Sequence, residues 1–152
     1  MTPVTSVALR VLERIHGHVG WLAALALLHP AILLRRPRRR AVLAASLATS
    51  LATAAGALGV ALYPPYRAQL KQRLFVTVPT VGWLFERKEH LAVGAIALAW
   101  IGLVAHLVAP RVPGGPARDA VARLAFHAYA LGAAMALVTA ILGLVVSAHG
   151  TF

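Results

Sequence analysis

Long apolar stretches alternate with short polar connections along this chain. We place four apolar helices over residues 16–34, 41–63, 90–109 and 119–148. Each stretch is apolar around the whole helix instead of along one stripe, and about 20 such residues cross the hydrocarbon core of a bilayer. The pattern predicts an all-α membrane protein, a four-helix up-and-down bundle that forms one domain over residues 1–152.

The connections between the apolar stretches differ in length. Pro64 and Pro65 predict a break after the second span. The mixed segment 64–88 is too long for a simple turn, so we expect it to be partly helical and to lie along the membrane surface. Asp119 marks the start of the fourth span. An aromatic belt at the outer interface is predicted for Trp21, Tyr63, Tyr66 and Trp83.

Composition supports a membrane location. Apolar residues make up 60% of the chain and charged residues 12%, against roughly 45–50% and about 25% in soluble domains. The net charge of +11 is confined to the connections, where it meets lipid phosphates and sets topology, so we expect lipid and not nucleic acid as partner. Five arginines within residues 35–40 predict a cytoplasmic connection, with both termini on the periplasmic side of a bacterial inner membrane.

Histidine is the best-supplied metal ligand of the chain, which has seven histidines and no cysteine. The absence of cysteine excludes disulfides, iron–sulfur clusters and covalent c-type haem. Imidazoles are costly in hydrocarbon unless they are paired, wetted or ligating. The predicted topology sorts them into two layers: His16, His18, His90 and His149 near the outer face, and His29, His106 and His127 near the inner face.

Helical phase decides which histidines of the first span can act together. His18 and His29 are eleven residues apart, so they point within about 20° of each other and lie roughly 16 Å apart along the axis. One helix can therefore offer a ligand to each layer. His16 points about 200° from His18, so at most one of the two faces inward, and we take His18.

On the third and fourth spans the helical phase of the histidines is less favourable for a pair of ligands on one face. His90 and His106 differ by about 160° in a straight helix, so only one of them is expected to face the interior. His127 and His149 share a face within about 40° but lie roughly 33 Å apart. We favour His127 over His106 as the inner ligand because it lies deeper.

Haem suits two layers of histidines on separate helices. Two imidazoles can bind its iron axially inside a four-helix bundle, and its propionates can meet basic residues at the membrane face. Candidate propionate partners are Arg14, Arg67, Arg73 and Arg87 in the outer layer and Arg36 and Arg123 in the inner layer. Glycines that would let the flat macrocycle approach the backbone are Gly17, Gly20, Gly94, Gly102, Gly132 and Gly143.

The paired histidines of the first span, with counterparts at matching depths on other spans, resemble the membrane dihaem cytochromes b. The resemblance covers the architecture of all four spans and no extended motif. It implies one or two b-type haems, ligated by His18 and His29, by His90 in the outer layer, and by His106 or His127 in the inner layer. It also implies electron transfer between a quinone and a partner redox protein of a membrane complex.

Other interpretations stay open. His16 and His149 are weaker ligand candidates, since interfacial histidines are ordinarily solvated by headgroups. His29 is also placed to bond a carbonyl freed by Pro30, and His90 to pair with Glu86 or Glu89. The chain is alternatively a non-catalytic accessory subunit of a larger membrane complex, or a histidine-lined metal or proton conduit. No buried carboxylate is expected, which weakens a proton pump.

Overall fold

The fold is helical throughout the part of the chain that the computed structural model describes, residues 3–36 and 41–149, with side chains from Val7 onward. Its elements are α1 (Pro3–Leu34), α2 (Val42–Tyr66), the π-helical turn η1 (Arg67–Lys71), α3 (Gln72–Thr77), α4 (Pro79–Val108), the 3-10 turn η2 (Ala109–Arg111) and α5 (Pro116–Ser147). Four stretches within these ranges are long and apolar enough to cross a membrane: Val7–Leu34, Val42–Thr77, Pro79–Arg111 and Pro116–Ser147.

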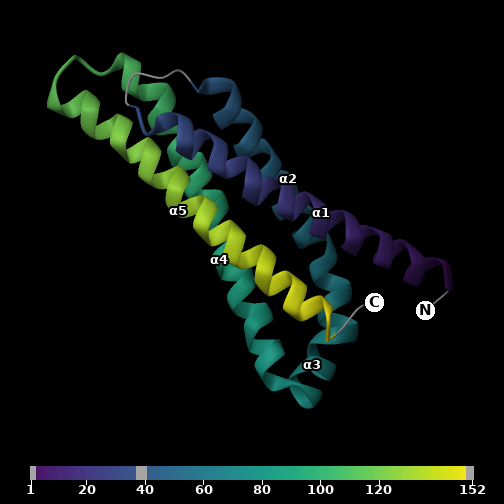
Figure 1. Cartoon of the computed structure of the whole chain (residues 1–152). Coiled ribbons are helices and arrows are strands. Elements are labelled where there is room, and N and C mark those ends of the chain that lie inside the picture. The colour runs from purple at the N-terminus through teal and green to yellow at the C-terminus, as the bar shows by residue number, and fades with distance from the viewer. Residues whose placement is uncertain (1–2, 37–40, 150–152) are drawn as a thin grey trace.

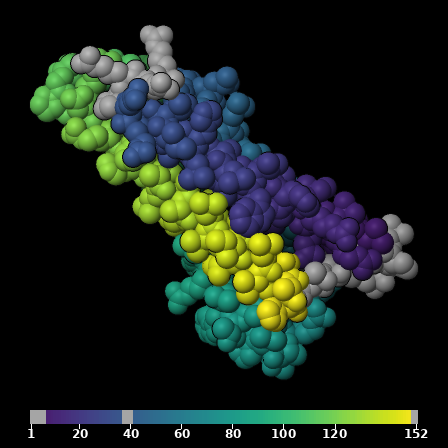
Figure 2. All heavy atoms as spheres, in the orientation of Figure 1, coloured from purple at the N-terminus to yellow at the C-terminus, as the bar shows by residue number. Residues whose placement is uncertain are grey.

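The four long helices run alternately up and down (Figure 1), which confirms the predicted bundle. Each helix packs on two neighbours, in the cyclic order α1, α2, α4, α5. α1 and α5 lie side by side on the face shown in Figure 2. We call the end with the α1–α2 and α4–α5 connections the loop end. The other end, with both chain termini and the α2–α4 hairpin, is the terminus end.

Alanine and glycine residues form the core in the half of the bundle nearer the loop end, which we call the loop half. Ala45, Ala99 and Ala133 are fully buried. A methyl group at Gly132 would lie 3.3 Å from the carbonyl oxygen of Ala95, so α4 and α5 approach closely there. Small side chains matter because lipid tails are as apolar as leucine, and membrane helices are held by close packing instead of the hydrophobic effect.

One buried hydrogen-bonded node joins three helices in this core. The Thr49 hydroxyl of α2 donates to the Ala99 carbonyl of α4 at 3.3 Å and lies 2.9 Å from the Tyr129 hydroxyl of α5. The Tyr129 hydroxyl in turn donates to the Ala45 carbonyl at 3.1 Å. Tyr129 is fully buried, and a methyl group at Gly102 would lie 2.8 Å from its ring. The node fixes the register of α5 against α2 and α4.

The expected break at Pro64 and Pro65 is wrong. α2 continues through both prolines to Tyr66 and then widens into η1, where the Arg67 N–H donates to the carbonyls of Tyr63 and Pro64. A proline removes one helical hydrogen bond, but a complete break in lipid would leave several more backbone groups without partners. A π-helical turn absorbs the change of register and keeps the chain helical.

The hairpin at the terminus end is helical on both sides, so the helix that contains the third apolar stretch already begins at Pro79. α3 and α4 meet at Val78, the one residue between them without helical structure. Tyr66 is buried and stacks on Phe85, with ring centroids 3.7 Å apart. Tyr66 therefore belongs to the core of the hairpin, which corrects its assignment to an aromatic belt.

Candidate functional site

His18 and His29 share one face of α1, as their spacing predicts, but that face points away from the bundle. Both side chains are exposed, in a row with Leu22, Leu25 and Ile32, which are 57%, 54% and 62% exposed. The opposite stripe of α1 holds Ala23, Ala24, Leu27 and Ala31 and faces the core. In a membrane the two imidazoles would face lipid or another protein.

His16 is the histidine of α1 that turns inward, so the choice of His18 as the inward-facing residue is wrong. The Nδ1 atom of His16 lies 3.1 Å from the Ala55 carbonyl oxygen of α2. A methyl group at Gly59 would lie 3.2 Å from the His16 ring. Glycine at position 59 thus provides the room in which the ring packs between α1 and α2.

Three other histidines are exposed and hydrogen-bonded to their own helices. The Nδ1 atoms of His90, His127 and His149 lie 2.7, 2.8 and 2.8 Å from the carbonyl oxygen four residues earlier, and His18 makes the same bond to Arg14 at 2.7 Å. Nδ1 is then the protonated nitrogen, which leaves Nε2 with a free lone pair, the form that binds metals. His90 makes this backbone bond and not the alternative ion pair with Glu86 or Glu89.

His106 lies at the loop end and holds the start of α2. Its Nε2 atom accepts a hydrogen bond of 3.2 Å from the Ala41 N–H. His106 is half-buried whereas His127 is exposed, so of these two histidines His106 is the one that turns toward the bundle. The expected phase difference between His90 and His106 is confirmed, since one ring points outward and the other toward α2.

A haem does not fit inside the bundle as the helices pack here. In the loop half, Tyr129 and the small side chains of the core occupy the space between the helices. Among the described side chains of residues 7–36 and 41–149, no group of three or more histidine, aspartate or glutamate residues could hold a metal ion. The predicted ligands His18, His29, His90 and His127 lie on the outside of this core.

The lipid-facing surface is hollowed beside His29. A groove of about 450 Å³ lies between α1 and α2, and we call it the α1–α2 groove. Its lining residues are Ala26, His29, Leu33, Ala41, Val42, Leu43, Ala44, Leu47 and Ala48. The volume is within the range of about 300–1,000 Å³ found for small-molecule sites, and the alanines let a flat ring approach the backbone.

His29 is the titratable group of this groove. No hydrogen bond to its ring from the described residues is found, so the alternative bond to a carbonyl freed by Pro30 is absent there. Ala26, His29 and Leu33 follow one another at helical spacing, and the exposed Arg36 lies just beyond the end of α1 at Leu34. The row therefore ends in an exposed cation, which suits an apolar ligand that carries an acidic group.

The predicted propionate partners are all exposed, and they are distributed over both ends of the bundle. Arg14 lies on α1, Arg67 in η1, Arg73 on α3 and Arg123 on α5. The carbonyl groups of Arg14 and Arg123 accept the hydrogen bonds of His18 and His127. The central part of the predicted arginine cluster, residues 37–40, lies outside the described residues.

A charged cluster at the terminus end was missed by the sequence argument. Lys88 of α4 interacts electrostatically with Glu13, Glu89 and His16, and its Nζ atom lies 4.8 Å from the centre of the Phe85 ring. Its aliphatic stem reaches Gly143 of α5. Lys88 is spaced seven residues from Ala95, so it lies on the interior stripe of α4, and this phase is the signal that could have identified it.

An ion pair and an unpaired hydroxyl complete this end of the molecule. Lys71 Nζ lies 2.7 Å from Glu86 Oε1, which ties η1 to α4. The buried hydroxyl of Tyr66 has no hydrogen-bond partner among the described residues. Between this cluster and the Thr49–Tyr129 node, α2 presents the buried Ala52 to the interior.

Taken together, these features define a four-span α-helical membrane protein. Comparison with protein-family models, curated proteins and solved structures found no match.

Proposed function

We propose that this protein is a b-type cytochrome subunit in which His29 supplies an axial ligand to haem at the α1–α2 groove. The observation that carries the proposal is the combination of one free imidazole with an apolar groove of about 450 Å³. Arg36, seven residues after His29, is placed to bind a propionate. Haem iron, when bound, accepts and releases one electron.

The second axial position would come from outside this chain's core. The imidazoles of His18, His29, His90 and His127 are exposed on the outside of the bundle, and an imidazole is costly to leave in hydrocarbon. A second membrane subunit that covers these faces would remove this cost and could supply the other ligand. The chain would then carry electrons between quinone and a partner redox protein in a bacterial inner membrane, with both termini on the periplasmic side.

The feature of α1 that favours a covering subunit is its pair of open glycines. Methyl groups at Gly17 and Gly20 would meet nothing within 4 Å, so packing within this chain does not require glycine at either position. Glycine on an outer face permits close approach of another helix. A non-catalytic accessory subunit is therefore the second candidate, and it predicts copurifying membrane proteins without a chromophore.

The test is an optical difference spectrum of the full chain, isolated from its own membrane in mild detergent together with the subunits that copurify. The proposal predicts a reduced b-type alpha band that is lost in His29→Ala and kept in His149→Ala. Both side chains are exposed, so neither substitution should unfold the bundle, and far-ultraviolet circular dichroism checks this. A wild-type chain without the band, or a His29→Ala variant that retains it, would refute the assignment.

A further inference from the structure

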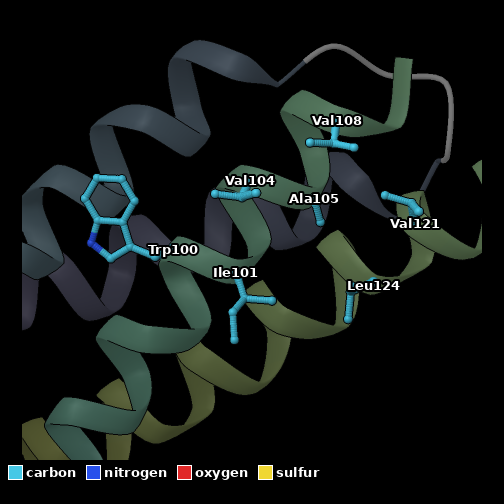
Figure 3. A pocket seen from close by; sticks show the side chains of 7 residues that line it. All are labelled: Trp100, Ile101, Val104, Ala105, Val108, Val121 and Leu124. Atoms are coloured by element: carbon cyan, nitrogen blue, oxygen red, sulfur yellow. The ribbon is translucent and has the colours of Figure 1, made fainter. Parts of the chain in front are cut away.

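A second groove lies on the lipid-facing side of α4 and α5, and we call it the α4–α5 groove. It encloses about 400 Å³ and is lined by Trp100, Ile101, Val104, Ala105, Val108, Val121 and Leu124 (Figure 3). Every lining side chain is hydrophobic, and none is a histidine. Haem therefore has no ligand here, and an apolar chain is the occupant that the walls match.

Both rows of lining residues end in an arginine at the loop end. Val104 and Val108 of α4 are followed by Arg111, the last residue of the 3-10 turn η2. On α5, Leu124 and Val121 are preceded by Arg118 at a spacing of three residues. Residues three and four apart lie on one face of a helix, so each wall of the groove leads to a cation.

The charge at this end of the groove is positive. Arg111 and Arg118 are exposed, and the guanidinium of Arg111 folds back onto the Leu107 carbonyl, along the helix that forms the groove wall. Arg123 is also exposed nearby in sequence, and Asp119 in the first turn of α5 is the one acidic residue of the loop end within the described ranges. The start of α5 adds unpaired N–H groups, which favour an anion.

We propose that the α4–α5 groove binds an anionic phospholipid, with one acyl chain along the apolar walls and the phosphate group held by Arg111 and Arg118. The positions along the helices agree with a lipid in a bilayer, because the apolar walls of the groove lie within the spans and the arginines lie at the ends of the spans. This site contains no residue of the α1–α2 groove, so the two proposals fail or hold independently.

The headgroup is tested by reconstituting the full chain into nanodiscs with equal amounts of phosphatidylglycerol and phosphatidylcholine. Lipid that remains bound after extraction is then identified by native mass spectrometry. We expect retained phosphatidylglycerol in the wild type. A basic residue near an anionic surface is worth about fivefold in binding, so Arg111→Gln with Arg118→Gln should reduce the preference about 25-fold.

Matched controls separate the site from the general charge of the molecule. Arg10→Gln with Arg14→Gln removes two exposed arginines of α1 at the terminus end and should leave the retained lipid unchanged. Val104→Trp fills the groove and should lower the retention of both lipids, whereas Val93→Trp, on an exposed position of the same helix, should not.

Three results would overturn the proposal. They are equal retention of both headgroups by the wild type, an equal loss in the two double arginine variants, and unchanged retention in Val104→Trp. A copurifying polypeptide that is displaced by Val104→Trp, with no lipid retained, would assign the groove to a protein partner instead. Thermal melts of all variants exclude unfolding as the cause of any loss.

Discussion

The two lipid-facing grooves at the loop end are built alike and differ in chemistry. Each lies between two antiparallel helices joined by a basic connection, and the volumes are about 450 and 400 Å³. His29 lies seven residues before Arg36, and Val104 lies seven residues before Arg111. Equivalent positions of the two grooves therefore hold an imidazole in one and an isopropyl group in the other.

The two grooves also differ in their other lining residues. Four alanines line the α1–α2 groove, whereas branched side chains and Trp100 dominate the α4–α5 groove. The small side chains suit a flat ring, and the branched ones suit a flexible chain. Helix packing thus creates grooves of similar size, and a few side chains determine what each groove can bind.

The largest expected effect comes from filling one groove without touching its imidazole. Ala44→Leu narrows the α1–α2 groove at a half-buried position, and we expect it to abolish the haem spectrum although His29 is intact. Val108→Leu in the other groove is the matched control and should leave the spectrum unchanged. Equal spectra in the two variants would show that the α1–α2 groove is not the haem site.

Removal of the buried Tyr129 side chain should destabilise both grooves together. Tyr129→Ala leaves a cavity at a fully buried position, and the expected loss in unfolding free energy is about 3–5 kcal/mol. Tyr129→Phe removes only the hydroxyl and should cost about 0.6–1.7 kcal/mol. Unfolding titrations in mixed micelles, followed by circular dichroism, measure both values. Similar losses in the two variants would mean that the ring does not hold the core.

Loss of the His106 contact should affect one groove only. His106→Ala leaves the part-buried Ala41 N–H without its acceptor, and an unsatisfied buried donor costs about 1–3 kcal/mol. Ala41 lines the α1–α2 groove, so hydrogen exchange should rise at the start of α2. The start of α5 should keep its protection, and a rise at both sites would contradict a local role.

The smallest change in unfolding free energy is expected from a substitution at the terminus end, far from both grooves. Glu86→Gln removes the ion pair with Lys71. Both side chains are partly exposed, at 24% and 34%, so the cost in unfolding free energy should be below about 1 kcal/mol. Lipid retention and the haem spectrum should not change. A change in either would connect the hairpin to the loop end.

Sequence alone determined the membrane class, the number of spans and the phase relations along each helix. These follow from local quantities: an apolar run long enough to cross the bilayer, and an angle of about 100° per residue. The shared face of His18 and His29 and the opposed directions of His90 and His106 were predictable for that reason. The continuation of α2 through Pro64 was not, because a proline has a different cost where water cannot replace the lost hydrogen bonds.

Only the tertiary structure decided which face of each helix points inward. α1 is apolar on nearly all sides, so its sequence could not distinguish the stripe with His18 and His29 from the stripe with Ala24 and Leu27. Packing chose the small residues for the interior, since close contact between helices is what stabilises a bundle in lipid. That choice placed the histidines outside, moved His16 and Lys88 inward, and formed the two grooves.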